Sequence, residues 1–201
     1  MVAIIDYGMG NLRSLENALD RLGAQYVVTS DREEILRAER VILPGVGNAG
    51  GAMRNLREKG LADWIPSLRR PVLGICVGMQ VLCRDSEETL DGNPGTTPCL
   101  GVFDAHVRRF PAEPGLKVPH MGWNDLGNLD GKLFTGLEKG PYVYFVHSYY
   151  AGTGPDTVAT CRYGGVLLSA ALRYENFYGT QFHPEKSGDV GEAILKNFMK
   201  L

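Results

Sequence analysis

The stretch PVLGICVGMQ, residues 71–80, joins an apolar, strand-like run to residues with helical spacing. Cys76 stands at the junction, two residues after Gly74 and two before Gly78. A sharp strand-to-helix turn that carries a nucleophile needs small residues on both sides, because the chain folds tightly around a strained residue. The pattern therefore predicts such a turn with Cys76 at a helix N-terminus, where the helix dipole favours a thiolate. The alternative is a buried structural cysteine.

The chain before this turn alternates β-branched runs with helical patterns. Strands are predicted at 2–5, 26–29, 41–43 and 72–75, and helical segments at 12–22, 53–57 and 61–68. This alternation indicates right-handed crossovers and a largely parallel sheet with helices on both faces. Such sheets place their chemistry at the carboxyl ends of the strands.

The sequence pattern changes after about residue 85. The chain there is rich in turns, and strands are predicted at 105–110, 142–149, 158–162 and 166–174, followed by a helix over 189–201 in which Ile194, Phe198 and Leu201 share a face. The fold class we expect is therefore α/β, a single domain over residues 1–201 with a mostly parallel central sheet, flanking helices and a mixed or antiparallel second half.

Composition narrows the classes of function. The net charge is −2 and the basic residues are dispersed, which disfavours nucleic acid as a partner. The N-terminal apolar run is short and has no preceding basic region, so we expect a cytoplasmic protein without a membrane segment. The four cysteines lie at 76, 83, 99 and 161 without CxxC spacing, and we expect neither a metal site nor a cofactor.

A thiolate nucleophile requires a base, and His183 in the segment Phe-His-Pro-Glu is the best candidate. Pro184 favours extended backbone before it, and residues i and i+2 of an extended chain share a face, which places Glu185 beside the His183 ring. Glu185 can then orient the imidazole as the third member of a triad. The alternative is a surface His-Pro turn. His106 and His147 lie in strand-like runs, where a structural role, or for His147 a place in a pocket wall, is the better interpretation.

A second glycine-rich turn, PGVGNAG at 44–50, follows the strand at 41–43. It matches GxGxxG, but it does not follow the first strand and lacks the acidic residue that a dinucleotide site requires. A plain turn is one interpretation. The other is that a backbone N–H of this turn points at a substrate oxygen beside Cys76.

Five motifs in chain order carry a resemblance that covers essentially the whole chain. They are DYGMGN at 6–11, LPGVG at 43–47, GICVGMQ at 74–80, PHMGWN at 119–124 and TQFHPEKS at 180–187. The sequence resembles the class I, or triad, glutamine amidotransferases. The combination of PGVG, PHMGWN and HPEKS is most similar to the glutamine amidotransferase subunits of imidazole glycerol phosphate synthase.

The resemblance implies a role for each site residue. Cys76 attacks the side-chain amide of glutamine, His183 relays protons and Glu185 positions His183. Backbone N–H groups of Val77 and of Val46 or Gly47 form the oxyanion hole. Gln80 and Glu88 contact the amino-acid end of glutamine. Val77 stands where leucine is usual in the family, which leaves its N–H in place.

The resemblance also implies a partner, because no synthase domain fits in this chain. The partner is a (β/α)8-barrel cyclase that forms a heterodimer with the glutaminase. It uses the ammonia to make imidazole glycerol phosphate and an aminoimidazole carboxamide ribotide in histidine biosynthesis. The motifs that face this partner in the family contain Met121, Trp123, Asn124 and Lys186.

Three other interpretations remain. One is a triad amidotransferase of guanylate, anthranilate or pyridoxal phosphate synthesis, which PGVG and PHMGWN argue against. Another is an α/β thiol hydrolase, which usually places its acid between nucleophile and histidine in the sequence, whereas Glu185 follows His183. The third is a noncatalytic interaction subunit, which the presence of all three triad residues disfavours.

Overall fold

A seven-stranded sheet forms the centre of the computed structural model, which describes residues 1–112 and 114–201. Its strand order is β11-β12-β13-β4-β3-β1-β2, with bounds β1 Val2–Ile5, β2 Tyr26–Thr29, β3 Arg40–Leu43, β4 Val72–Ile75, β11 Thr157–Tyr163, β12 Val166–Tyr174 and β13 Phe177–Thr180. Strands β1 to β4 and β13 are parallel, and β11 and β12 continue the sheet antiparallel. Strands β1, β4 and β13 are buried along their whole length, as expected for a parallel sheet covered on both faces.

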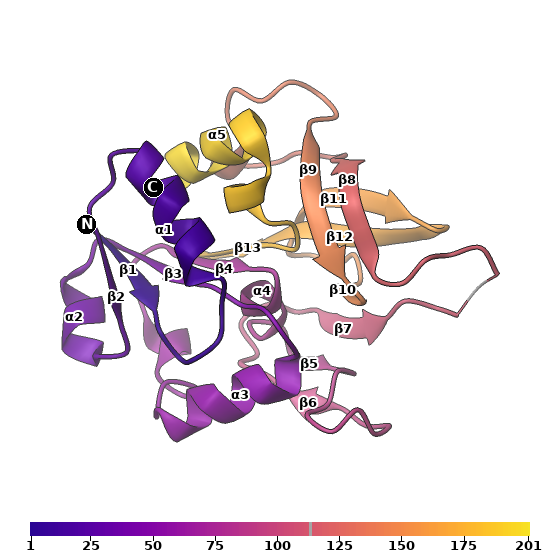
Figure 1. Cartoon of the computed structure of the whole chain (residues 1–201), viewed down its shortest axis with the longest axis horizontal. Coiled ribbons are helices and arrows are strands. Elements are labelled where there is room, and N and C mark those ends of the chain that lie inside the picture. The colour runs from indigo at the N-terminus through magenta and orange to yellow at the C-terminus, as the bar shows by residue number, and fades with distance from the viewer. Residues whose placement is uncertain (113) are drawn as a thin grey trace.

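Helices cover both faces of this sheet. The α-helices are α1 Leu12–Arg21, α2 Arg32–Arg37, α3 Ala49–Glu58, α4 Val77–Gln80 and α5 Gly188–Phe198, and the 3-10 helices are η1 Ile65–Ser67, η2 Lys132–Phe134 and η3 Pro184–Lys186. Helices α1 and α5 lie together on one side of the sheet and α3 lies on the other (Figure 1). Asn11 caps α1 and Asn48 caps α3, each by accepting a backbone N–H three residues later.

Two smaller sheets stand beside the carboxyl ends of the central strands. One has the order β10-β7-β5-β6, with β5 Asp85–Ser86, β6 Thr97–Pro98, β7 His106–Arg109 and β10 Tyr149–Ala151. The other is an antiparallel pair of β8 His120–Asp125 and β9 Tyr142–His147, in which His120 lies opposite His147. The predicted mixed second half is thus confirmed.

Several predicted elements differ from the structure. The helix predicted at 61–68 is a short turn containing η1, because Pro66 occupies its first turn and Leu68 is already extended. The strand predicted at 142–149 is interrupted at Ser148 and forms β9 and β10. The helix after Cys76 has only four residues, and Leu201 lies beyond the end of α5, although Ile194 and Phe198 are buried as predicted.

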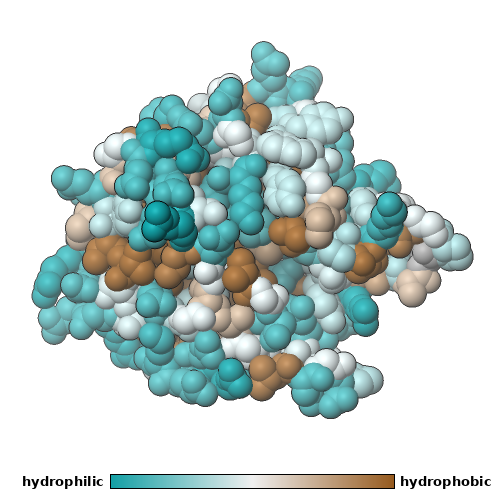
Figure 2. All heavy atoms as spheres, in the orientation of Figure 1, coloured by the Kyte–Doolittle hydropathy of each residue, from teal (hydrophilic) through white to brown (hydrophobic). Residues whose placement is uncertain are grey.

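Apolar side chains gather in a core that includes residues from the central strands and helices as well as from β7, β9 and β10. The face seen in Figure 2 is mostly hydrophilic, with separate apolar patches. Among the residues that the structure describes, no helix has the length and apolarity needed to cross a membrane.

Candidate active site

The turn after β4 holds Cys76 in a strained backbone conformation. Its φ is 54° and its ψ is −111°, which a residue with a Cβ adopts only where the surrounding structure enforces it. The N–H of Cys76 donates to the carbonyl of Thr180 at the end of β13, at 2.7 Å, and α4 begins at the next residue. Cys76 therefore stands on the sharp strand-to-helix turn that the sequence predicted.

The glycines around Cys76 are required by close backbone contacts. A Cβ on Gly74 would lie 2.6 Å from the Gly78 carbonyl oxygen, and a Cβ on Gly78 would lie 1.9 Å from the Leu43 oxygen. Across the sheet edge, a Cβ on Gly45 would lie 2.2 Å from the Gly78 nitrogen. The absence of these side chains lets the Cys76 turn and the turn after β3 pack against each other.

His183 follows β13 and lines the same cavity as Cys76, close enough for Cys76 to raise the pKa of its ring. Its Nδ1 is 2.7 Å from Glu185 Oε1, and the two side chains are only 2% and 4% exposed. The predicted pairing is therefore present, but its predicted local geometry is wrong. His183 itself is extended, whereas Glu185 lies in the 3-10 helix η3, which folds the carboxylate back towards the ring.

The environment of His183 favours the charged imidazolium. Burial alone would lower its pKa, but hydrogen bonds and charge attraction from Cys76 and Glu185 outweigh burial and raise the pKa of His183 to about 10. The ring can thus hold a proton near neutral pH, and the Glu185 contact at Nδ1 leaves Nε2 for the thiol or a substrate atom.

A cavity of about 310 Å³ opens beside Cys76. Its lining includes most of the residues for which the sequence analysis predicted a role, namely Val46, Gly47, Cys76, Val77, Gln80, Glu88, His183 and Lys186. Glu185 lies behind His183, in the wall of a second and much smaller cavity. The structure thus brings the predicted catalytic, oxyanion and substrate positions to one pocket.

Two backbone segments could hold an oxyanion in this pocket. Val77 is the first residue of α4, so its N–H has no acceptor within the helix. The turn after β3 is fixed at its start by the Tyr7 hydroxyl, which donates to the Pro44 carbonyl at 2.6 Å. Gly47 in this turn has a φ of 91°, a conformation that a residue with a side chain rarely adopts.

Glu88 and Gln80 line the same cavity. The Glu88 carboxylate accepts the N–H of Ala49 at the start of α3, at 2.9 Å, and burial raises the pKa of Glu88 although this hydrogen bond opposes the shift. Gln80 Nε2 donates to the Tyr149 carbonyl and to Gln181 Oε1, both at 2.9 Å. Gln80 Oε1 is buried and accepts no hydrogen bond from the described residues.

Sequence reasoning assigned no role to Tyr7 or Gln181. Gln181 is fully buried, and its Nε2 lies 3.8 Å from Cys76 Sγ. Tyr7 lies in the motif DYGMGN and Gln181 in TQFHPEKS. A motif does not show that the first side chain will contact the Pro44 carbonyl or that the second will approach Cys76 Sγ. Tyr7 lies two residues after β1, which was predicted, whereas Gln181 directly follows β13, which the sequence analysis did not predict.

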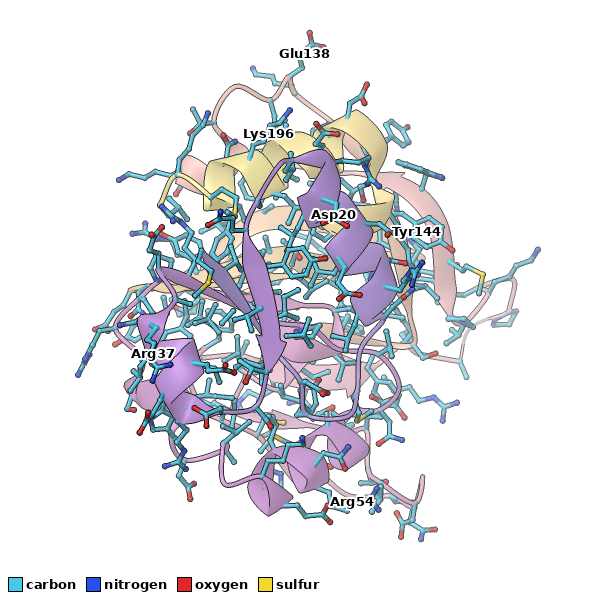
Figure 3. The ribbon with its side chains drawn as sticks, turned by 60° about the vertical axis from the view of Figure 1, so that its left-hand side comes forward. Asp20, Arg37, Arg54, Glu138, Tyr144 and Lys196 are labelled. Atoms are coloured by element: carbon cyan, nitrogen blue, oxygen red, sulfur yellow. The ribbon has the colours of Figure 1, made fainter. Side chains whose placement is uncertain are left out.

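Three of the four predicted partner residues lie on β8 and divide between its two faces, while Lys186 lies in η3. Met121 and Trp123 point outward and are 62% and 55% exposed. Tyr144 of β9, labelled in Figure 3, pairs with Trp123 and lies on the same outward face. Asn124 points the other way, and its Nδ2 donates to the carbonyl of Arg162 within the chain. Contact of these residues with a partner stays a prediction.

No group of three or more histidine, cysteine, aspartate or glutamate side chains in ranges 1–112 and 114–201 is arranged to hold a metal ion. The pocket holds a buried thiol near an imidazole that contacts a carboxylate, with backbone N–H groups nearby, which is the arrangement expected of a thiol acyl-transfer centre.

Comparison with known proteins identifies the class and then the subgroup. Residues 3–201 match the family described as glutamine amidotransferase class-I, and the chain belongs to that family. It is 52% identical over 201 residues to the imidazole glycerol phosphate synthase subunit HisH of Bacteroides fragilis, covering 100% of this chain and 99% of the relative. It is 48% identical to the HisH subunit of Bacillus cereus, covering 98% of this chain and 93% of the relative. The family predicted from the motifs is confirmed.

Solved structures agree on the fold. A crystal structure described as glutamine amidotransferase matches with a TM-score of 0.73 and 22% identity, covering 100% of this chain and 98% of the other. At this level of identity the likeness supports the predicted α/β fold alone.

Proposed function

We propose that this chain hydrolyses glutamine to glutamate and ammonia through Cys76, His183 and Glu185, as the glutaminase subunit of imidazole glycerol phosphate synthase. The observation that carries the proposal is the buried His183–Glu185 pair, 2.7 Å apart, beside a cysteine on a strained turn. The strong identity to HisH subunits over the whole chain supports the pathway.

The chemistry begins with the thiolate of Cys76. Its sulfur attacks the side-chain carbonyl carbon of glutamine, and the oxygen takes up negative charge that backbone N–H groups of Val77 and of Val46 or Gly47 stabilise. His183 then donates a proton to the departing nitrogen, and the C–N bond breaks to release ammonia and leave a glutamyl thioester on Cys76.

The second half returns the enzyme to its starting state. Neutral His183 takes a proton from water as the water oxygen attacks the thioester carbon. The C–S bond breaks, glutamate leaves and the thiolate of Cys76 forms again beside the imidazolium. Glu185 holds the ring and stabilises its charge in both steps.

The part of the pocket lined by Glu88 suits the amino-acid end of glutamine. Glu88 offers a carboxylate that accepts hydrogen bonds, and Gln80 lines the same cavity, although its own carbonyl oxygen is buried. An ammonium group presents three donors and no acceptor, so the substrate's α-ammonium is the group that fits beside Glu88.

Ammonia released in water would be protonated and diluted, so the subunit must deliver it to a synthase directly. The partner is a (β/α)8-barrel cyclase that consumes ammonia to make imidazole glycerol phosphate and an aminoimidazole carboxamide ribotide. The outward face of β8 and β9, with exposed Met121, Trp123 and Tyr142, is the surface we assign to this heterodimer.

The deciding experiment measures glutamate release from glutamine by the chain alone and by the chain with the cyclase loaded with its nucleotide, with Cys76→Ala as the control. We expect release with the loaded partner and none from the variant. If a functional cyclase elicits no release, the pathway assignment fails. Other ammonia-using synthases then test whether the triad serves a different amidotransferase.

A further inference from the structure

Two buried histidines lie outside the triad. His120 on β8 and His147 on β9 face each other across the two-stranded sheet and are 3% and 6% exposed. His120 Nδ1 is 3.0 Å from His147 Nε2. Polar groups buried this deeply need hydrogen-bond partners at both ring nitrogens, so the outer nitrogens of the pair show what it connects.

The partners at the two ends allow one arrangement of protons. Asn124 Nδ2 donates to the Arg162 carbonyl at 3.1 Å, and the same nitrogen reaches His120 Nε2 at 3.3 Å, so His120 Nε2 accepts. At the other end, His147 Nδ1 lies 2.7 Å from the Tyr149 carbonyl, which can only accept. Both rings therefore carry hydrogen on Nδ1, and His120 donates to His147.

The surroundings keep both rings neutral, as this arrangement requires. The His120 ring stacks on Tyr163 and on Phe145, with centroids 3.9 and 4.7 Å away. Burial lowers the pKa of His120 to about 4. Burial likewise lowers the pKa of His147 to about 3, although its hydrogen bond to Tyr149 opposes the shift.

The inner end of this chain of hydrogen bonds reaches the glutamine pocket. The Tyr149 carbonyl accepts from His147 and also from Gln80 Nε2, and all three residues line the cavity. Gln80 uses its other N–H on Gln181, whose own Nε2 approaches Cys76 Sγ. With both hydrogens engaged, the Gln80 amide has one orientation, and its buried oxygen accepts no hydrogen bond from the described part of the chain.

We propose that His120 is a positioning residue for glutamine hydrolysis, which acts through His147 to fix the Tyr149 carbonyl and the Gln80 amide in the pocket wall. The proposal rests on the glutaminase function proposed above. Its physical basis is the pair of hydrogen bonds that hold the His147 ring, one at each nitrogen. Without the His120 donor, buried His147 Nε2 loses its partner, and the ring and the Tyr149 carbonyl are held by one hydrogen bond instead of two.

The tautomers can be observed without any assay of activity. Nitrogen-15 NMR of the imidazoles in the full chain should show hydrogen on Nδ1 of both rings and no protonated ring at neutral pH. His120→Leu should shift the His147 Nε2 resonance, because the hydrogen bond from His120 is lost, and His120→Asn, whose side-chain amide can donate from the place of Nδ1, should restore it. A wild-type spectrum with hydrogen on His147 Nε2 overturns the proposal, as does an unchanged His147 spectrum in His120→Leu.

Kinetics of the complex with the loaded cyclase test the consequence for substrate. Because Gln80 lies in the pocket wall assigned to the unreacting end of glutamine, His120→Leu should raise KM for glutamine about tenfold and change kcat by less than about twofold. His120→Asn should keep KM within about twofold of wild type. His106→Leu, at an exposed histidine paired with Asp85 on β7 and β5, is the matched control and should leave both constants unchanged.

Either of two kinetic results overturns the proposal: a folded His120→Leu variant with the KM of the His106→Leu control, or His120→Asn as impaired as His120→Leu. Should His120→Leu fail to fold, the wild-type spectrum and the His120→Asn variant still decide the question. A wild-type complex that releases no glutamate contradicts the proposed function, and the spectrum then tests the histidine pair by itself.

Discussion

At the scale of single residues, the site depends on an ionised pair kept out of water. His183 and Glu185 are almost fully buried, so neither charge is tolerable without the other. Cys76, and then Glu185, give His183 its raised pKa, and this shift links catalysis to the stability of the fold.

Glu185→Gln tests that link. The pKa of His183 is about 10 in the folded chain and near 6.5 in the unfolded chain. The charged His183 ring therefore contributes stability that is complete below about pH 6.5 and is lost as pH rises through about 10. The variant should therefore be less stable than wild type by about 2 kcal/mol at pH 6, with a smaller deficit at pH 10.5. Urea unfolding at the two pH values measures this difference. An equal deficit at both would contradict the charged pair.

Tyr7 is a second residue whose role lies in one hydrogen bond. Tyr7→Phe leaves the Pro44 carbonyl without its donor and loosens the turn that contains Val46 and Gly47. If that turn supplies an oxyanion donor, kcat for glutamine should fall about tenfold while KM changes little. Burial, and then the neighbouring Cys76, raise the pKa of Tyr7, so its hydroxyl remains a donor at every pH of the assay.

Tyr163→Phe is the matched control for this variant, because the Tyr163 hydroxyl also donates to a backbone carbonyl, that of Lys117, at 2.7 Å and outside the cavity. Equal losses of kcat in the two variants would show that Tyr7 has no special connection to the oxyanion turn.

At the scale of elements, the site is a junction of three strand ends. Strands β3, β4 and β13 are neighbours in the sheet. The turn with Gly45 follows β3, Cys76 follows β4 and His183 follows β13. Because these strands run parallel, their carboxyl ends meet at one edge, although the three residues are far apart in the sequence.

Gly78→Ala tests how tightly this junction is packed. The new Cβ would lie 1.9 Å from the Leu43 oxygen, a backbone atom that can move only if β3 and α4 separate. We expect a loss of more than about 4 kcal/mol of unfolding free energy, or failure to fold. Gly152→Ala is the control, since a Cβ there meets no atom within 4 Å. Similar urea midpoints for the two variants would show that β3 and α4 can separate at little cost in stability.

The sequence predicted the parts of this junction that have local signals. Strands β1, β2 and β4 and the glycine pattern around Cys76 follow from apolar periodicity and turn chemistry. Strand β13 was not predicted, because Phe-Tyr-Gly-Thr is short and contains a glycine, whose Cβ would lie 2.3 Å from Met79. Its place between β12 and β4 is set by tertiary packing, which no local pattern records.

The same distinction applies to the site. The triad could be predicted because its members lie in short motifs with a stated chemistry. The contacts of Tyr7, Gln181 and the His120–His147 pair could not, because each joins residues 27 or more positions apart through side chains that a sequence reads as ordinary core.

At the scale of the whole molecule, the outward face of β8 and β9 lies directly behind the catalytic base. The backbone N–H of His183 donates to the Tyr144 carbonyl, and Tyr144 pairs with Trp123 across the sheet. A protein bound on this face would therefore contact strands that hold His183 in place, which gives partner binding a short physical route to the triad.

Trp123→Ala tests whether this face binds the cyclase. An exposed tryptophan at the centre of an interface is a frequent hot spot, so the variant should weaken the complex at least tenfold, as measured by calorimetric titration. Its stability as an isolated chain should change by less than about 0.5 kcal/mol. Tyr174→Ala, at another exposed aromatic side chain, should bind as wild type does. Equal affinities of the two variants would place the partner elsewhere.

Lys186 connects the pocket to this face, because it lines the cavity and belongs to η3, which packs against β9. If its role is to couple the two active sites, Lys186→Ala should lower the yield of imidazole glycerol phosphate per glutamate released more than it lowers glutamate release itself. Parallel assays of the two products in the complex measure this ratio. Lys196→Ala, which removes an exposed lysine paired with Glu192 on α5, is the control. If Lys186→Ala binds the cyclase as tightly as wild type does and gives the same yield of imidazole glycerol phosphate per glutamate, Lys186 has no role in binding the partner or in ammonia transfer.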